Sequence, residues 1–161
     1  MTKSYSERLL FDDTAFSLNE GEKVGLIGVN GTGKSTLLNM LAGLEKPSKG
    51  EIEIAGRHIE KLTEKQLVTF RRQRVGFIFQ AYNLLNTMNA IENVALPLSF
   101  RGISKRERMK TAQKFMELVG VGDQAKHMPN QMSGGQQQRV GIARALVVNP
   151  QIIFADEPTG N

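Results

Sequence analysis

The segment Lys23–Ala42, with the sequence KVGLIGVNGTGKSTLLNMLA, decides the fold that we expect for this chain. Its apolar run at residues 24–27 is typical of a buried strand, and a glycine-rich turn follows it. Apolar residues then recur at Leu37, Leu38 and Leu41, which is the spacing of one face of a helix. The segment therefore predicts a strand, a tight turn and a helix in direct succession.

The turn in this segment carries residues suited to holding phosphate. Gly28, Gly33, Lys34 and Ser35 match the spacing G-x-x-x-x-G-K-[ST] of the phosphate-binding P-loop. Glycines here and at Gly31 let backbone N–H groups point inward at an anion, and the helix N-terminus adds unpaired N–H groups. Lys34 is then expected to reach the β- and γ-phosphates, and the Ser35 hydroxyl to bind Mg²⁺. The alternative is an ordinary glycine-rich turn with a solvated lysine.

The composition of the 161 residues is ordinary for a soluble globular domain, with 40% hydrophobic and 23% charged residues. There is no cysteine, which excludes disulfides and thiolate metal sites. No apolar run approaches membrane-spanning length, and residues 1–8 contain no signal-peptide core. A cytoplasmic location is therefore expected.

The net charge of +5 raises the question of a nucleic-acid partner. Basic residues gather at positions 71–74 and 105–110, but no aromatic residues alternate with them. Runs of this kind are more often solvated helix faces than nucleic-acid surfaces. We therefore expect solvated helix faces and no nucleic-acid partner.

Short strands are predicted on both sides of the P-loop segment. Turn signals and apolar positions within residues 3–20 predict two short strands that pair antiparallel. Gly43 is the expected end of the first helix. Residues 51–55 alternate polar and apolar side chains, so Ile52 and Ile54 should face the same side of a strand. Together these strands are expected to form one small antiparallel sheet.

The middle of the chain is predicted to be largely helical. Thr63 and Gln66 form a capping-box pattern that opens a helix to about Arg72. Residues 75–79 predict a second buried strand, which leads into Gln80. Helical composition follows from residue 81 to about 131. One helix there opens with Ser104 and Glu107 and carries apolar residues at Met109, Ala112, Phe115, Met116 and Val119.

The last third of the chain predicts a helix and a strand that end in polar residues. Residues 132–136, MSGGQ, precede a helical run at 137–148, which Asn149-Pro150 terminates. The buried strand at residues 151–155 then leads into Asp156 and Glu157.

The two acids at the end of this strand suit a site that contains a metal and a nucleotide. Two acids after a strand are often only solvated, but a P-loop upstream favours a role for Asp156 in holding Mg²⁺. Glu157 is placed to polarise a water molecule as the general base. Gln80 is either a contact of the metal or the attacking water, or a glutamine bonded to solvent.

The segment Ser133–Gln136 also allows two interpretations. Ser133 and Gln136 form a capping box, and the glycines between them could be a mere hinge. Alternatively, the helix N-terminus is a second anion site. Two such sites far apart in one chain could hold one phosphate between two copies placed head to tail.

Four segments resemble the motifs of an ATP-binding-cassette (ABC) nucleotide-binding domain. They occur in the family's order and at its usual separations, as Walker A, Q-loop, signature and Walker B: Gly28–Ser35, Gln80, Met132–Gln136 and Ile152–Glu157. Met132 stands where the family usually has leucine, which is a swap that conserves volume.

The resemblance implies an α/β fold for the single domain 1–161. It has a P-loop NTPase core, an antiparallel β flank and a helical subdomain. The β flank and the core lie in residues 1–80, and the helical subdomain lies in residues 81–131. The signature helix and the Walker B strand lie in residues 132–161.

The resemblance also implies ATP and Mg²⁺ as cofactors, with ATP bound between the P-loop of one ABC domain and the signature of a second. The implied ATP-binding residues are Tyr5, Gly28, Asn30, Gly31, Thr32, Gly33, Lys34, Ser35, Thr36, Ser133, Gly134, Gly135 and Gln136. Catalytic roles fall to Glu157, Lys34 and Gln80, and Mg²⁺ ligation to Ser35, Gln80 and Asp156. Tyr5 is expected to stack on adenine, with Phe11 as a competitor.

The resemblance leads to one expected function and two alternatives. Residues 80–85, 92–98 and 156–161 resemble the exporter ATPases of lipoprotein release and of macrolide and peptide efflux. The implied function is an ATP-hydrolysing subunit that powers a membrane transporter. It lies on the inner face of the membrane, and its helical lobe contacts transmembrane subunits. Residues 21–35 look closer to soluble, ribosome-associated ABC proteins. A kinase or GTPase with a P-loop is disfavoured by the signature segment.

The chain departs from the family pattern after Asn161. The family continues with a D-loop, a switch histidine and further core strands. His58 and His127 precede the Walker B strand and cannot be that histidine. The chain is therefore expected to be a fragment that lacks the C-terminal core strands, binds ATP weakly and hydrolyses it poorly.

Overall fold

The computed structural model describes residues 3–5, 8–11, 34–54 and 56–155. The chain divides into two compact units, Met1–Arg71 and Arg72–Asn161, each of which is described by itself. The strand predicted at residues 24–27 lies outside the described residues. None of the described helices is long and apolar enough to cross a membrane.

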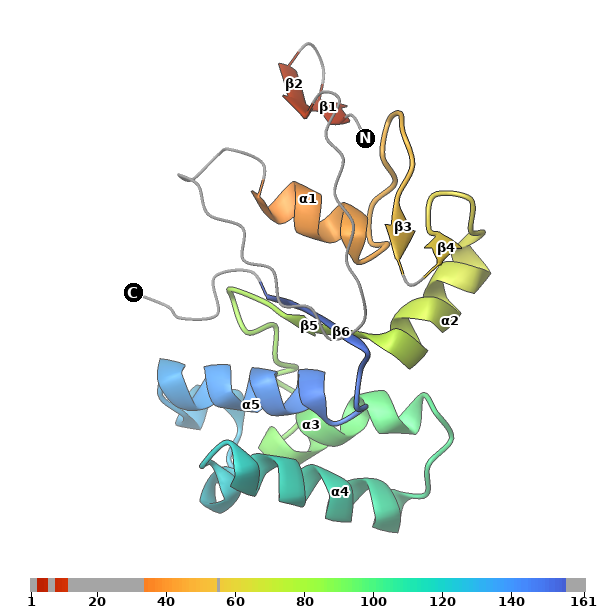
Figure 1. Ribbon diagram of the computed structural model, residues 1–161. Helices are drawn as coiled ribbons and strands as arrows, with labels where there is room; N and C mark the ends of the chain where they lie inside the picture. Colours follow the sequence, from red (N-terminus) through yellow and green to blue (C-terminus); the bar gives the residue numbers. More distant parts are fainter. Residues whose placement is uncertain (1–2, 6–7, 12–33, 55, 156–161) are drawn as a thin grey trace. The chain divides into compact units, whose positions relative to one another are not determined.

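The described elements succeed one another in the order drawn in Figure 1. In the first part of the chain they are β1 (Lys3–Tyr5), β2 (Arg8–Phe11), α1 (Lys34–Leu41), β3 (Glu53–Ile54), β4 (Arg57–His58) and α2 (Glu64–Arg74). They continue with β5 (Val75–Ile78), α3 (Ala90–Ser99), α4 (Lys105–Leu118), the 3₁₀ turns η1 (Gly122–Gln124) and η2 (Pro129–Gln131), α5 (Gly134–Leu146) and β6 (Ile152–Ala155).

The short strands of the first unit form two ladders. Strand β1 pairs antiparallel with β2, and β3 pairs antiparallel with β4. The expectation of one small sheet is therefore wrong for the described residues, because these ladders are separate. Ile52 and Ile54 are both buried, as their alternation predicts. Strand β4 escaped prediction because it has only two residues, after a turn at Gly56 with φ +73°.

Helix α1 begins at Lys34, the residue from which the P-loop pattern predicts a helix. Its core-facing side buries Leu37, Met40 and Leu41. The helix stops before Gly43, which has φ +67°, a conformation that favours glycine. The capping box predicted for α2 is also present. The Thr63 N–H donates to Gln66 Oε1 at 2.9 Å, and the Gln66 N–H donates to Thr63 Oγ1 at 3.4 Å.

The arginines at the end of α2 are not the purely solvated face that the sequence predicts. Arg71 donates to the carbonyl of Gly43, within the first unit. In the second unit Arg72 donates to the carbonyl of Phe100 at 3.0 Å, and Arg74 donates to the side chain of Gln151. These cations therefore satisfy carbonyl and amide oxygens that would otherwise need water.

The second unit contains a parallel pair of strands. Strand β5 pairs with β6 in a register that places Phe77 opposite Phe154 and Ile78 opposite Ala155 (Figure 1). Parallel pairing is typical of an α/β fold. Helix α5 passes so close to β5 that a Cβ on Gly76 would lie 2.7 Å from the carbonyl oxygen of Ala145. Only glycine fits there.

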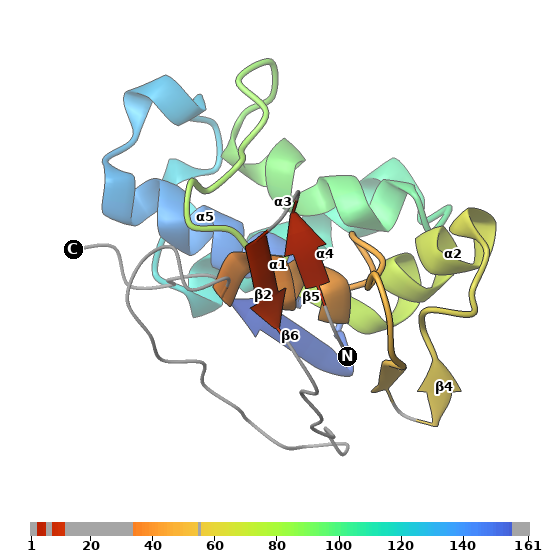
Figure 2. The same ribbon diagram turned by 90° about the horizontal axis from the view of Figure 1, so that it is seen from above.

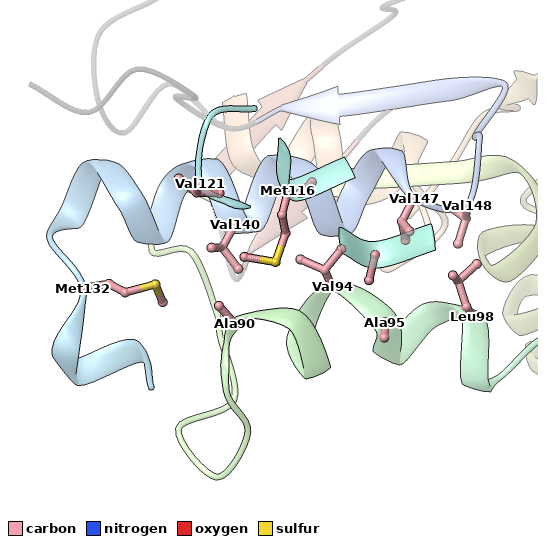
Figure 3. Packing of buried hydrophobic residues seen from close by; sticks show 12 residues of the cluster. Ala90, Val94, Ala95, Leu98, Met116, Val121, Met132, Val140, Val147 and Val148 are labelled. Carbon is pink, nitrogen blue, oxygen red and sulfur yellow. The ribbon is translucent and has the colours of Figure 1, made fainter. Parts of the chain in front are cut away.

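Helices α3, α4 and α5 pack against one another and form the helical body of this unit (Figures 1 and 2). Met116 of α4 points between Val94 of α3 and Val140 of α5 (Figure 3). All three side chains are fully buried. The predicted apolar face of α4 is confirmed, because Ala112 and Met116 are buried and the other predicted positions pack against the same core.

The segment between β5 and α3 is irregular, and a buried amide holds its end. Asn93 of α3 is fully buried. Its Oδ1 accepts from the Leu85 N–H at 2.8 Å, and its Nδ2 donates to the carbonyls of Leu85, Met88 and Asn89 at 3.0–3.1 Å. A polar side chain can be buried at this position because every one of its hydrogen-bonding groups has a partner.

Candidate nucleotide-binding site

The start of α1 presents polar groups at the position that the P-loop pattern predicts. Ser35 is exposed and Thr36 is half-buried, whereas Leu37 at the next position is buried. The first N–H groups of any α-helix lack a partner within the helix and carry the positive end of its dipole. The N-terminal end of α1 is therefore suited to binding an anion.

The other predicted contacts around this helix lie mostly outside the described residues. These are Gly28, Asn30, Gly31, Thr32, Gly33, Asp156 and Glu157. Tyr5 belongs to β1, where it pairs with Arg8, and Phe11 ends β2. The roles of all these residues in binding and catalysis remain predictions.

The start of α5 has the capping box predicted for the signature segment. The Ser133 N–H donates to Gln136 Oε1 at 2.8 Å, and the Gln136 N–H donates to Ser133 Oγ at 3.3 Å. Met132 before the cap is buried, and its carbonyl accepts from Gln137 Nε2 at 3.1 Å. The Ser133 hydroxyl accepts one bond in the cap and still has its own hydrogen to donate. The structural and the anion-binding interpretations are therefore compatible.

The two glycines of the signature have different surroundings, although both are exposed. A Cβ built on Gly135 would meet no atom within 4 Å. A Cβ on Gly134 would lie 3.1 Å from the hydroxyl oxygen of Tyr82. The Tyr82 phenol thus lies against the first turn of α5.

Gln80 lies in a turn that comes directly after β5. The Tyr82 N–H donates to the carbonyl of Phe79 at 3.2 Å, which leaves Gln80 and Ala81 in the middle of the turn. The side chain of Gln80 is exposed. Tyr82 and Asn83 have φ values of 57° and 47°, in the left-handed region that side chains rarely adopt.

Arg144 of α5 binds this turn, which the sequence alone did not predict. Its Nη2 donates to the carbonyl of Tyr82 at 2.7 Å, and its Nη1 donates to that of Asn83 at 2.6 Å. The guanidinium carbon lies 5.9 Å from the centre of the Phe79 ring. Burial lowers the pKa of Arg144. The signal in the sequence was a lone cation within the apolar run 140–148.

The predicted metal ligands share one chemical character. A serine hydroxyl, a glutamine amide oxygen and an aspartate carboxylate offer oxygen atoms only, which is the donor type that Mg²⁺ prefers. Ser35 and Gln80 are both exposed residues. The residues present therefore fit Mg²⁺ rather than a metal that needs nitrogen or sulfur.

A second group of side chains able to bind a metal lies on the β3–β4 hairpin. His58 Nδ1 is 3.2 Å from Glu60 Oε1, and Lys61 Nζ is 3.4 Å from Glu51 Oε1. Burial raises the pKa of Glu60. Hydrogen bonds from the backbone N–H groups of Ile52 and of Glu60 itself outweigh this effect, together with the nearby charges of His58 and Lys61. The net result is a lowered pKa of Glu60. The Lys61 ammonium supplies a cation here, so the group is a structural ion-pair network.

Comparison with known proteins gives the family. The model of the ABC transporter family matches residues 11–160. The chain belongs to the ABC transporter family. This confirms the resemblance drawn from the four sequence motifs.

Relatives with curated names support this membership. An uncharacterized ABC transporter ATP-binding protein of Thermotoga maritima is 50% identical over 147 residues, which are 91% of this chain and 63% of that protein. The macrolide export ATP-binding/permease protein MacB 1 of Yersinia pestis is 46% identical over 151 residues. That match covers 94% of this ABC chain and 23% of the relative. The chain thus spans less than two thirds of the length of both relatives.

Solved structures confirm the predicted fold of this ABC chain. The dimeric structure of MJ0796, a bacterial ABC transporter cassette, matches with a TM-score of 0.93 and 43% identity, over 99% of this chain and 72% of that one. A dimeric post-hydrolysis state of MJ0796 bound to ADP and Pi matches with a TM-score of 0.91 and 42% identity, over 98% and 71%. The chain therefore has the α/β fold of an ABC cassette with a P-loop.

Proposed function

We propose that this chain binds and hydrolyses ATP and thereby powers a membrane transporter, specifically an exporter. The observation that carries the proposal is the start of α1 at Lys34, directly after the glycine pattern, with Ser35 exposed. Family membership adds support, because a related cassette has been solved with ADP and Pi.

The start of α1 supplies most of the binding energy in this proposal. Backbone N–H groups of the P-loop and of the first turn surround the phosphates, and the ammonium group of Lys34 neutralises their charge. Thr36 adds a hydroxyl one residue beyond Ser35. Adenine stacks on Tyr5, or on Phe11 in the alternative assignment.

Mg²⁺ would be held by oxygens of Ser35, Gln80 and Asp156. When bound, it neutralises charge on the phosphates and on the oxygen that leaves. The carboxylate of Glu157 accepts a proton from the attacking water, and Gln80 orients that water by hydrogen bonding. Lys34 stabilises the negative charge that develops on the transferred phosphoryl group.

A second copy of the domain completes the site. The exposed Ser133 and Gly134, and the open surroundings of Gly135, suit the γ-phosphate held by the P-loop of a partner. Gln136 stabilises this surface through the capping box. Dimeric structures of the related cassette support such an assembly.

The transporter role rests on the relatives. The macrolide export relative combines ATP-binding and permease parts, and it favours an exporter over the ribosome-associated alternative. Transmembrane subunits would dock on the helical lobe at residues 81–131, which contains α3 and α4. We place the chain in the cytoplasm, peripheral on the inner face of the membrane.

Nucleotide affinity tests the binding part of this proposal. ATP binding is measured by calorimetry with and without Mg²⁺, for the wild type and for Lys34→Ala. We expect Lys34→Ala to weaken the binding of ATP at least about tenfold, because a hydrogen bond to a charged group contributes about 1.5–3 kcal/mol. Arg106→Met, at an exposed cation of α4, serves as the control and should leave affinity unchanged. Equal affinity of Lys34→Ala and the wild type would refute the assignment.

Fractionation of cells tests the transporter part. A tagged chain is expressed in cells of its source organism, and membranes are separated from ribosomes by sedimentation. We expect the chain to co-purify with membrane subunits and not with ribosomes. Recovery in the ribosomal pellet would instead support the translation-factor alternative that residues 21–35 suggest.

A further inference from the structure

We propose that Arg144 is a positioning residue that holds the turn carrying Gln80 and fixes this turn to the signature helix. The inference rests on the proposed function, because it concerns the placement of the glutamine expected to contact Mg²⁺ or the attacking water.

The contacts of Arg144 lie on both sides of Gln80. Before Gln80, the ring of Phe79 lies under the guanidinium, with 5.9 Å between its centre and the guanidinium carbon. After Gln80, the carbonyls of Tyr82 and Asn83 accept from the two terminal nitrogens at 2.7 and 2.6 Å. One side chain therefore restrains both ends of the turn and leaves Gln80 exposed at its middle.

The turn requires such a restraint because its backbone is in an unfavourable conformation. Tyr82 and Asn83 both have positive φ, which asparagine adopts more readily than tyrosine does, so most of the cost falls on Tyr82. Left-handed conformations of residues with a Cβ persist where the surrounding structure overdetermines them. The hydrogen bonds from Arg144 orient the two carbonyls, so they stabilise this backbone.

Arginine suits this position better than lysine does. A planar guanidinium donates two hydrogen bonds in a fixed fork and also stacks on an aromatic ring. A lysine ammonium can reach one of the two carbonyls, but it has no plane to place over Phe79. The burial that lowers the pKa of Arg144 also strengthens its hydrogen bonds, because water competes less for them.

A second contact joins the same turn to the start of α5. The hydroxyl oxygen of Tyr82 lies 3.1 Å from where a Cβ on Gly134 would be. The turn thus lies against the signature helix at its first turn, at Gly134, and is hydrogen-bonded to it near its end, by Arg144. The Gln80 turn and α5 therefore move together.

The consequence is a defect in turnover that depends on Gln80. Without Arg144 the turn samples other conformations, and the Gln80 amide is in its working position for less of the time. ATP affinity should change little, because Lys34 and Ser35 on α1 supply the main phosphate contacts in the proposed function. A merely structural role would instead lower both quantities, or would act independently of Gln80.

A double-mutant cycle measures this dependence. Turnover of ATP is followed with protein in excess over ATP, so that slow rates remain measurable. The variants are Arg144→Met, Arg144→Lys, Gln80→Ala and the combination of Gln80→Ala with Arg144→Met. We expect Arg144→Met to slow turnover about tenfold in the wild type and less than about twofold in Gln80→Ala. Arg144→Lys should fall between, and Arg106→Met should match the wild type.

A fluorescence measurement tests the restraint without nucleotide. The sequence has two tyrosines and no tryptophan, so in Tyr5→Phe the only emitting side chain is Tyr82. We expect Arg144→Met, and to a smaller extent Arg144→Lys, to increase quenching of this emission by acrylamide. Arg106→Met should leave quenching unchanged, and circular dichroism shows whether each variant is folded.

The outcomes separate the inference from the function on which it rests. If Arg144→Met slows Gln80→Ala as strongly as it slows the wild type, or if quenching does not change, Arg144 does not position Gln80. If the wild type does not hydrolyse ATP, the proposed function fails, and quenching still decides whether Arg144 holds the turn. If Arg144→Met does not fold, Arg144→Lys decides both measurements.

Discussion

Helices α1 and α5 both begin beside glycines, but their first turns are held in different ways. Ser133 precedes α5 and caps it, so one N–H of the first turn is already bonded to the chain itself. The residue before α1 in the sequence is Gly33, which has no side chain to act as a cap. We therefore expect the first turn of α1 to depend more on an external anion than the first turn of α5, which Ser133 caps.

The largest expected effect is a difference between α1 and α5 in how strongly ATP slows the exchange of their first amide hydrogens. With ATP at a hundred times its Kd, binding stabilises the bound state by about 2.7 kcal/mol. We expect amide hydrogens in the first turn of α1 to exchange up to about 100-fold more slowly. In dilute protein without dimers, those at the start of α5 should change little. Hydrogen exchange read by mass spectrometry or NMR gives both values in one experiment.

A variant and a concentration series control that experiment. Lys34→Ala should remove most of the protection at α1 and leave exchange at α5 as it is without ATP. Raising the protein concentration should bring protection to α5 only if ATP joins two copies. If ATP slowed amide exchange at the start of α5 as strongly as at α1 in dilute solution, the proposed difference between the two helices would be wrong.

A smaller effect is expected from removing the cap of α5. Ser133→Ala deprives the Gln136 N–H of its acceptor and should lower the free energy of unfolding by about 1 kcal/mol. Denaturation by urea measures this loss. ATP affinity of the single domain should remain unchanged, because α1 supplies that binding. Ser133→Asp, which can also cap, should retain most of the stability, and a loss equal to that of alanine would contradict the role of the cap.

The predictable parts of this fold are those set by local chemistry. Capping boxes at Thr63 and Ser133, the stop at Gly43 and the apolar face of α4 depend on side chains a few residues apart, and all are confirmed. Strands were predicted at residues 75–79 and 151–155, but the parallel pairing of β5 with β6 was not. A run of buried residues alone does not identify the neighbouring strand.

The parts that escaped prediction depend on contacts between distant segments. Arg144 and the carbonyls of Tyr82 and Asn83 are far apart in the sequence, at separations of 62 and 61 residues. No periodicity links them. The positive φ of Tyr82 was equally hidden, because tyrosine gives no local signal for it. Long-range hydrogen bonds can impose a conformation that the local sequence disfavours.

The smallest effect distinguishes the two glycines at the start of α5. Alanine favours a helix over glycine by up to about 1 kcal/mol, and the gain should be smaller in a first turn. Gly135→Ala has open space and should stabilise the domain by about 0.5 kcal/mol. The methyl group of Gly134→Ala would lie 3.1 Å from the Tyr82 hydroxyl, so part of that gain is lost as the phenol shifts.

Removing that hydroxyl tests the cause of the difference. In a Tyr82→Phe background the added methyl no longer meets an oxygen, so both alanine variants should then be equally stable in urea. If the difference persists, it arises from the helix backbone rather than from the phenol.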